Sequence, residues 1–361
     1  MGGAEVLMST LLPELERQGT HVELICLNSK SEPLIINRLK KAHVKIHTLS
    51  FKQSLYNPIH IFAIHKLVHR IKPDIIHAHI FPTFYWVALA KFFFRHKAPL
   101  ILTEHDTSNR RMANRIFRLA DLFIYRNYAQ IICISDGVLN VIRNYIPFVP
   151  SKTIYNGISL EQYKKKSPTC KSKTLYDFVE RILSNSSNKI ILSIGRLVAK
   201  KNQETMIRMM SLLPSNYHLL ICGEGEYREN LEKLIQELNL TNNVFLLGNQ
   251  DDIPFIAKKS SIGILSSTIE GFGLAAAEMM ASGLPVVSSN IPGLNELCPD
   301  PQLQSDPMDV DKFASIIQLL LTNNTFFNEM KQKSIEKAES FSIQKMAENY
   351  RMEYEILQAN K

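Results

Sequence analysis

Two carboxylates, Glu270 and Glu278, flank a short stretch that reads Gly-Phe-Gly-Leu. An apolar, β-branched run precedes this stretch and a helix-forming run, 274–281, follows it, which predicts a strand, a tight loop and a helix. Gly271 and Gly273 would let the loop bend and let its backbone approach a ligand closely. The helix start favours a phosphate, and ionised carboxylates accept hydrogen bonds from hydroxyl groups. We therefore predict a phosphate on the helix terminus, with sugar hydroxyls on the two glutamates.

A pair of cations follows another strand-like run, 190–194. The sequence there is Gly195-Arg196-Leu197, and Lys200-Lys201 comes three residues later. Open α/β sheets bind ligands in the crevice at the carboxyl ends of their strands, so we expect Arg196 and Lys201 to project into that crevice. Two cations can stabilise the negative charge of a departing nucleoside diphosphate without a metal ion.

The two glutamates, eight residues apart around Gly-Phe-Gly-Leu, resemble the signature of retaining glycosyltransferases of family 4, which adopt the GT-B fold. The resemblance extends through Pro285-Val-Val-Ser288, through Gly293-Leu-Asn-Glu296, and through Gly-Arg-Leu with Lys201 five residues after Arg196. It implies retaining transfer from a nucleotide sugar, with UDP favoured and GDP the alternative. The implied acceptor is a hydroxyl of a glycan or lipid-linked molecule in bacterial cell-surface polysaccharide or glycoconjugate synthesis, and no cofactor or essential metal is expected.

The resemblance also assigns roles by position. His105 matches the family histidine that faces the donor sugar, Glu270 would position donor hydroxyls, and Glu278 would hold the ribose. The residues expected to be catalytic are Glu270, His105, Arg196 and Lys201. The residues expected to bind the donor are Gly3, Arg196, Lys201, Gly223, Glu270, Gly271, Phe272, Gly273, Leu274 and Glu278. His77 and His79, which end a neighbouring strand, could border the acceptor.

The length of 361 residues and the regular alternation of strand and helix patterns predict two parallel α/β domains. We expect GT-B, with two Rossmann-like domains facing across a cleft. The first is residues 1–157, onto which a C-terminal helix, 343–361, packs back, and the second, 158–342, binds the nucleotide sugar. Gly2-Gly3 resembles the glycine loop of the first domain. Since a strand ordinarily precedes that loop, we expect the first strand to be missing from this chain.

The net charge of +8 is unevenly distributed. Residues 1–150 hold 19 Lys and Arg against 10 Asp and Glu, giving +9, whereas the remainder holds 23 against 24, giving −1. The predicted helix 112–126 is rich in arginine, and a helical wheel places Arg111, Arg115, Arg118 and Arg126 on one face, with Ile116 and Phe123 towards the other. We predict that this basic face docks on an anionic membrane surface, which would make the protein cytoplasmic and peripheral on the inner face of the cell membrane.

Other interpretations remain open at this stage. The chain could bind a nucleotide sugar without turnover because of the missing strand, and the basic helix could simply pack on the sheet with its arginines in water. A basic half can also indicate nucleic acid, but no recognition module is visible, so no nucleic-acid partner is expected. Asp309-Val-Asp311 begins a predicted helix, where aspartates cap, so we do not expect a metal site there.

Overall fold

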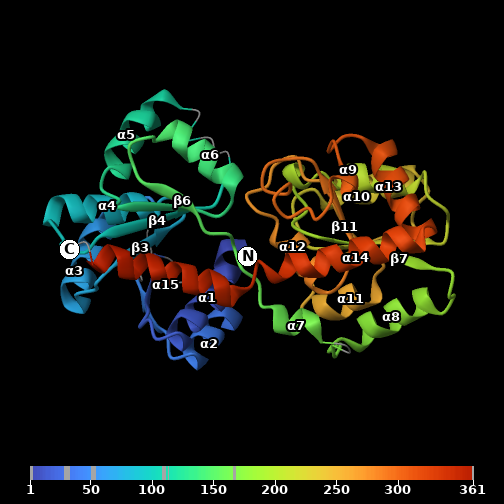
Figure 1. The fold of residues 1–361 in the computed structure, drawn as a ribbon, viewed down its shortest axis with the longest axis horizontal. Coiled ribbons are helices and arrows are strands. Elements are labelled where there is room, and N and C mark those ends of the chain that lie inside the picture. Colours follow the sequence, from blue (N-terminus) through green and yellow to red (C-terminus); the bar gives the residue numbers. More distant parts are fainter. Residues whose placement is uncertain are drawn as a thin grey trace. The chain divides into compact units, whose positions relative to one another are not determined.

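The computed structural model describes residues 3–27, 33–49, 54–107, 111–112, 114–165 and 168–359, without the side chains of 33–35, 115 and 116. The chain divides into two compact units, each an α/β assembly (Figure 1). Unit 1 comprises residues 1–157 and 343–361, and unit 2 comprises residues 158–342. These bounds coincide with the two domains expected from the sequence.

Unit 2 contains one six-stranded sheet in which every pairing between strands is parallel. Its strand order is β12-β11-β10-β7-β8-β9. The strands are β7 (Lys189–Ile194), β8 (Tyr217–Cys222), β9 (Val244–Gly248), β10 (Ile262–Leu265), β11 (Val286–Ser289) and β12 (Gln304–Ser305). Most strand residues are buried, as expected for a parallel sheet that is covered on both faces, so the prediction of a parallel α/β unit is confirmed.

Helices connect the strands of unit 2 and share a large apolar core with them. In Figure 1 several of them are drawn on either side of the sheet. Residues 159–188 contain two helices, and both belong to unit 2. The helices are α7 (Leu160–Lys164), α8 (Lys173–Leu183), α9 (Gln203–Met210), α10 (Arg228–Glu237), α11 (Ile253–Lys259), α12 (Leu274–Ala281), α13 (Val310–Thr322) and α14 (Asn324–Glu339), with short 3₁₀ turns η1 (Ala199–Lys201) and η2 (Pro301–Leu303).

Unit 1 holds its strands in two separate parallel sheets, β1-β2 and β3-β4-β5-β6. Among the described residues no strand pairing joins the two sheets. In a Rossmann-like order a further strand would lie between β1 and β3, which is where the two sheets of the described residues are separate. The strands are β1 (Glu23–Cys26), β2 (Lys45–Thr48), β3 (Ile76–His79), β4 (Leu100–Glu104), β5 (Gln130–Cys133) and β6 (Ser151–Thr153).

Two helices from opposite ends of the chain, α1 and α15, pack together in unit 1. Leu11 of α1 and Tyr350 of α15 are buried in one apolar cluster with Ile101 and Ile132 of the larger sheet, and Leu24 of the smaller sheet packs against it. The C-terminal helix therefore belongs to the first unit, as expected. The helices of unit 1 are α1 (Gly3–Arg17), α2 (Pro33–Lys41), α3 (Ile59–Ile71), α4 (Thr83–Phe94), α5 (Arg115–Tyr125), α6 (Asp136–Tyr145) and α15 (Ile343–Ala359).

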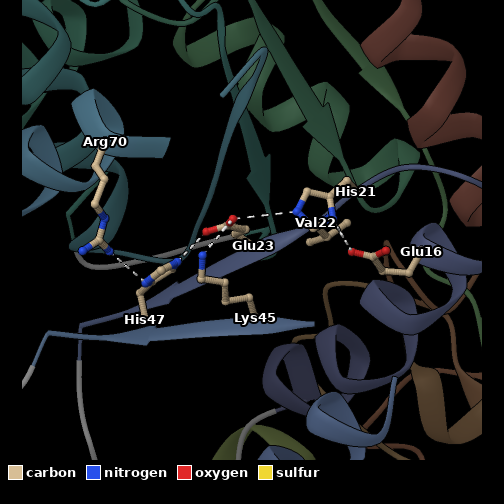
Figure 2. Close-up of polar contacts among 7 residues, drawn as sticks. All are labelled: Glu16, His21, Val22, Glu23, Lys45, His47 and Arg70. Atoms are coloured by element: carbon tan, nitrogen blue, oxygen red, sulfur yellow. Dashed lines mark hydrogen bonds and ion pairs between the residues drawn. The ribbon is translucent and has the colours of Figure 1, made fainter. Parts of the chain in front are cut away.

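A polar cluster holds the two-stranded sheet to its neighbouring helix (Figure 2). Glu23 of β1 contacts the His47 ring of β2 at 2.5 Å and the Lys45 amine at 3.4 Å, and Arg70 of α3 lies 3.4 Å from the other nitrogen of His47. The hydrogen bond to His47 lowers the pKa of Glu23 below its usual value. Because Leu24 faces the apolar cluster, these charged side chains alternate with it and occupy the opposite face of the β1-β2 sheet.

Phe92 and Phe93 in the last turn of α4 are exposed. The expected orientation of the arginine-rich helix is wrong. Arg111 was expected on an outer basic face, but it precedes α5 and is buried, while Phe123, expected on the inner side, is exposed. Arg110 and the side chains of Arg115 and Ile116 lie outside the described residues.

Candidate functional site

The strand order of unit 2 reverses between β7 and β10, which are neighbours in the sheet. From β7 the chain proceeds outward through β8 and β9, and it then returns to place β10, β11 and β12 on the other side. Such a reversal separates the loops that follow the two central strands and opens a crevice at their carboxyl ends, where open α/β sheets bind ligands. The loop after β7 carries Arg196 and Lys201, and the loop after β10 carries Glu270.

Lys201 and Glu270 form an ion pair at this point. The two side chains are 16% and 11% exposed, so they are largely shielded from water. Hydrogen bonds fix the two loops to each other, since the Thr268 N–H donates to the Lys200 carbonyl at 2.9 Å and the Ser266 hydroxyl donates to the Asn202 carbonyl at 2.6 Å. The structure thus brings together a cation predicted for the diphosphate and a carboxylate predicted for the sugar.

Two glycines near the glutamates, Gly273 and Gly293, have backbone conformations that favour glycine. Gly273 has φ +95° and precedes the first residue of α12, and a Cβ there would lie 2.5 Å from the Leu294 side chain. Gly293, in the segment that also resembles the family, has φ +90° and would bring a Cβ within 2.7 Å of the Glu270 carbonyl oxygen. No side chain caps α12, and its Ala276 and Ala277 N–H groups donate to the Gly273 carbonyl, so an anion would bind at the Leu274 end of the helix. Phe272 is buried against Phe341, which leaves its backbone as the part that could face a ligand.

Glu278 lies one turn into α12, as predicted. Burial raises the pKa of Glu278 to about 7, and a hydrogen bond with Tyr163 of α7 opposes that rise. A carboxyl group with this pKa is partly protonated at neutral pH, so it can donate as well as accept a hydrogen bond. That property suits a vicinal pair of hydroxyl groups, such as those of a ribose.

Arg196 and Gly223 also follow strands of this sheet, at the carboxyl ends of β7 and β8. Arg196 is exposed at the end of β7, where its backbone carbonyl accepts a hydrogen bond from Gln203 at 2.9 Å. Gly223 follows β8 with φ +144°, and a Cβ there would lie 2.0 Å from the Gly195 carbonyl oxygen. Gly223 is therefore required by the close approach of two loops, and its contact with the donor stays a prediction.

His105 lies in unit 1, directly after β4, beside two further histidines of β3. The His79 and His105 rings approach at 3.3 Å between Nδ1 and Nε2, and the His77 and His79 rings stack with centroids 4.3 Å apart. Burial lowers the pKa of His105 to about 4 and of His77 to about 3, and it lowers the pKa of His79 well below 6.5. All three rings are therefore neutral at physiological pH, so His105 can offer a hydrogen bond but not a positive charge.

His77 has a structural partner in the C-terminal helix. Its ring lies 2.8 Å from the Tyr354 hydroxyl of α15 and 2.7 Å from the Thr103 hydroxyl of β4. These contacts occupy both ring nitrogens, so a structural role accounts for His77 without the predicted contact with the acceptor. His79 contacts His105 directly and keeps that prediction.

A buried ionic network beside His105 was not predicted. Arg111 pairs with Asp121 and lies 3.8 Å from Glu104, the residue before His105. Burial raises the pKa of Glu104 to about 7, while Tyr125 and Arg111 oppose that rise. The sequence signal was the acidic residue within the arginine-rich stretch, since Asp121 is the sole carboxylate between residues 107 and 135.

The remaining predicted features are at helix starts. Gly3 is the first residue of α1, and Gly2 lies outside the described residues. Asp309 caps α13 by accepting a hydrogen bond from the Lys312 N–H at 2.9 Å, which confirms the capping role. Over the described part of the chain, no group of three or more His, Cys, Asp or Glu side chains could hold a metal ion.

Both halves of the chain match models of glycosyltransferase families. The model described as Glycosyl transferases group 1 matches residues 177–341, and the model described as Glycosyltransferase Family 4 matches residues 1–162. The second half of the chain is thus similar to the group 1 glycosyl transferases and the first half to glycosyltransferase family 4, and together the two matches cover most of the chain. The recognition made from the glutamate pair and from Gly195-Arg196-Leu197 is thereby confirmed.

Three curated relatives illustrate how much of the chain is shared. A Haemophilus influenzae protein named an uncharacterized glycosyltransferase is 30% identical over 175 residues, so this chain spans about half the length of that relative (50%) and the match covers 47% of this chain. An Escherichia coli UDP-Gal:alpha-D-GlcNAc-diphosphoundecaprenol alpha-1,3-galactosyltransferase is 26% identical over 83% of this chain and 80% of its own. A Campylobacter jejuni N-acetylgalactosamine-N,N'-diacetylbacillosaminyl-diphospho-undecaprenol 4-alpha-N-acetylgalactosaminyltransferase is 29% identical over 96% of this chain and 94% of its own.

Solved structures establish the fold. Anabaena HepE, solved in complex with UDP and glucose, matches with a TM-score of 0.80 and 21% identity over 97% of this chain and 95% of that chain. A glycosyltransferase from Rickettsia africae matches with a TM-score of 0.85 and 19% identity over 100% of this chain and 96% of that chain. The GT-B fold predicted from the sequence is confirmed.

Proposed function

We propose that the protein transfers a sugar from a UDP-sugar to a hydroxyl group of a lipid-linked glycan, with retention of configuration at the anomeric carbon. The observation that carries the proposal is the Lys201–Glu270 ion pair at the reversal of strand order, beside the uncapped start of α12. A cation, a carboxylate and the start of a helix meet there at the carboxyl ends of two central strands. A nucleotide sugar needs these groups, because its diphosphate is anionic and its hydroxyl groups are hydrogen-bond donors.

Each group of the unit 2 site has a distinct task in the transfer. The α12 amides, Arg196 and Lys201 would stabilise the charge that develops on the leaving diphosphate. When the diphosphate binds Lys201, Glu270 is released from its ion pair and can accept hydrogen bonds from the donor sugar. The bond from the anomeric carbon to the diphosphate oxygen breaks, the bond to the acceptor oxygen forms on the same face, and the acceptor proton passes to the leaving phosphate oxygen. No separate general base is required, and His105 is proposed as a neutral hydrogen-bonding residue.

The names of the relatives support the donor and the acceptor. The Escherichia coli relative is named for UDP-Gal and for an acceptor on diphosphoundecaprenol, and the Campylobacter jejuni relative is also named for a diphospho-undecaprenol acceptor. Both names specify an alpha linkage, which corresponds to retention when the donor is an α-linked UDP-sugar. Anabaena HepE was solved with UDP, which favours UDP over GDP. We place the reaction in bacterial glycoconjugate synthesis, on the cytoplasmic side of the membrane.

Two substitutions test the site. Glu270→Gln and Arg196→Ala should each lower the rate of transfer at least about a hundredfold, the scale of losing one preorganised contact to the transition state. Glu204→Gln and Arg208→Ala, which change exposed residues of α9, are matched controls and should retain the rate. Near-normal transfer by both site variants, measured with a radiolabelled UDP-sugar and a lipid-diphosphate acceptor, would contradict the proposed site.

A protein that binds the nucleotide sugar without turnover is the second candidate, because the sheet of unit 1 is interrupted between β1 and β3. Thermal shift with a panel of nucleotide sugars separates the two candidates, since a bound donor stabilises the folded protein by mass action. Stabilisation by a UDP-sugar together with transfer supports the enzyme. Stabilisation with neither transfer nor donor hydrolysis, across several acceptors, supports the binding protein.

A further inference from the structure

The ends of α4 and α5 expose large apolar side chains next to one another in unit 1. Phe92 and Phe93 close α4 and are 51% and 62% exposed, while Leu119 and Phe123 on α5 are 72% and 42% exposed. The Phe92 and Phe123 rings are 4.9 Å apart between centroids, and those of Phe92 and Phe93 are 5.4 Å apart. These four residues form one connected patch, which we call the α4–α5 surface, and Figure 1 shows the two helices that carry it.

The segments that carry the α4–α5 surface are rich in exposed cations and lack exposed carboxylates, and the Arg118 and Arg126 guanidinium groups lie over the rings of Tyr145 and Phe148 at 5.8 and 4.9 Å. Arg95 and Lys97 follow α4, and Arg118 and Arg126 lie on or next to α5, all four exposed. No Asp or Glu occurs from residue 75 to residue 103, and the one acid from residue 107 to residue 135, Asp121, is fully buried. The two segments therefore combine exposed apolar side chains with exposed positive charge and no exposed negative charge.

We propose that the α4–α5 surface attaches the protein to an anionic membrane. Exposed phenylalanine and leucine can bury their side chains at the boundary between headgroups and acyl chains, while arginine and lysine bind anionic headgroups. Each cation near the membrane surface strengthens binding about fivefold. None of the described helices is long and apolar enough to cross a membrane, and the surface supplies reversible attachment. The exposure and charge of this surface carry the proposal. The proposed lipid-linked acceptor only explains why membrane attachment would be useful, so the inference rests on the proposed function in that respect alone.

The charge of the α4–α5 surface favours an anionic membrane over a second copy of the chain as its binding partner. A symmetric dimer through this surface would place Arg95, Arg118 and Arg126 of one copy near the same residues of the other, with no exposed acid on the surface to pair with them. An anionic bilayer supplies the missing negative charge. The earlier expectation of a basic docking helix is thus corrected: Arg111 takes no part because it is buried, and apolar residues of α4 and α5 are exposed as well as the arginines.

Vesicle sedimentation of the full chain tests the proposal. The protein should pellet with vesicles of phosphatidylcholine and phosphatidylglycerol, fail to pellet with phosphatidylcholine alone, and bind less at high salt. The double variant Phe93→Ser/Leu119→Ser should lower the partition coefficient at least about tenfold, because two exposed apolar side chains would no longer enter the bilayer boundary. Arg118→Gln/Arg126→Gln should lower it about tenfold or more and flatten the salt dependence.

The matched control is Leu212→Ser/Leu319→Ser, which changes two exposed leucines of unit 2 and should sediment like the wild type. Circular dichroism establishes that every variant is folded. Equal sedimentation of the α4–α5 variants and the wild type, or absence of wild-type binding to anionic vesicles, would overturn the proposal. Loss of a concentration-dependent dimer in Phe93→Ser/Leu119→Ser without loss of vesicle binding would assign the surface to a second copy instead. Transfer to a detergent-solubilised acceptor should be unchanged in these variants, and its absence from the wild type would count against the proposed function alone.

Discussion

The three histidines at the ends of β3 and β4 should make the stability of unit 1 fall steeply below pH 6.5. Burial lowers the pKa of His105 to about 4 and of His77 to about 3, and it lowers the pKa of His79 well below 6.5. The folded unit keeps these rings neutral, whereas the unfolded chain protonates them near pH 6.5. Because the unfolded state then binds more protons, the stability is fully present above pH 6.5 and is lost as the pH falls towards the folded pKa values.

Glu104 reduces the number of protons that unit 1 takes up on unfolding by about one. Burial raises its pKa from 4.5 to about 7, so between these values the folded unit holds a proton that the unfolded chain releases. Between about pH 5 and pH 6, unfolding therefore takes up about three protons on the histidines and releases about one from Glu104. The free energy of unfolding of unit 1 should therefore fall by about 3 kcal/mol from pH 6 to pH 5.

The fluorescence of Trp86 reports the unfolding of unit 1 independently of unit 2. It is the single tryptophan of the chain and lies in α4, where its ring N–H donates to the Leu55 carbonyl at 2.9 Å. Urea titrations followed by its fluorescence at several pH values give the slope of stability against pH. His105→Asn should reduce that slope to about half, because one titrating group is removed.

The control for this experiment is His43→Asn. His43 is exposed, and its φ of +60° is a conformation that asparagine tolerates, so the substitution should leave the slope unchanged. A wild-type slope below about 1 kcal/mol for each pH unit, or equal slopes for the wild type and His105→Asn, would refute the conclusion that the folded protein keeps these rings neutral.

Three further outcomes are expected. Gly223→Ala should destabilise unit 2 by about 3 kcal/mol or more, because the new Cβ would meet the Gly195 carbonyl oxygen at 2.0 Å, and calorimetry showing an unchanged melting temperature would contradict this. Asp121→Asn should destabilise unit 1 by about 3 kcal/mol, since it leaves the buried Arg111 without its charged partner, and an unshifted Trp86 transition would count against the network. Sugar transfer should survive EDTA, because two cations and a helix terminus are proposed to meet the diphosphate charge, and loss of activity that is restored by Mg²⁺ or Mn²⁺ would reject that proposal.

Much of unit 2 could be predicted because its local patterns and its topology agree. Parallel strands buried on both faces appear as short apolar runs, and the strands at 190–194 and 262–265 could be placed in this way. Once both runs belong to one parallel sheet, their carboxyl ends share an edge. The convergence of Lys201 and Glu270 then follows from position in the sequence, whereas their direct ion pair depends on side-chain conformations that no pattern specifies.

Unit 1 was harder to predict because long-range polar partners decide the orientation of its side chains. The spacing of the arginines suggested a single outer face, but Arg111 turns inward to Asp121 and Glu104. His77 similarly appeared as one of several strand-end histidines, and its partner Tyr354 is 277 residues further along the chain. Neither pairing leaves a periodic signal, so both required the folded structure.

The orientation of α5 shows why hydrophobic periodicity failed there. At about 100° per residue, Asp121 and Tyr125 lie on one face of the helix, and Leu119 and Phe123 lie about 120–160° away from them. Turning the helix by half a turn would bury the two apolar side chains, but it would expose Asp121 and leave Arg111 buried without a partner, a loss of about 3–5 kcal/mol. The fully buried Asp121, held also by Tyr145 at 2.7 Å, therefore fixes the helix with its apolar residues outward. The apolar residues of the α4–α5 surface are therefore exposed whenever unit 1 is folded, which is consistent with the proposed attachment to a membrane.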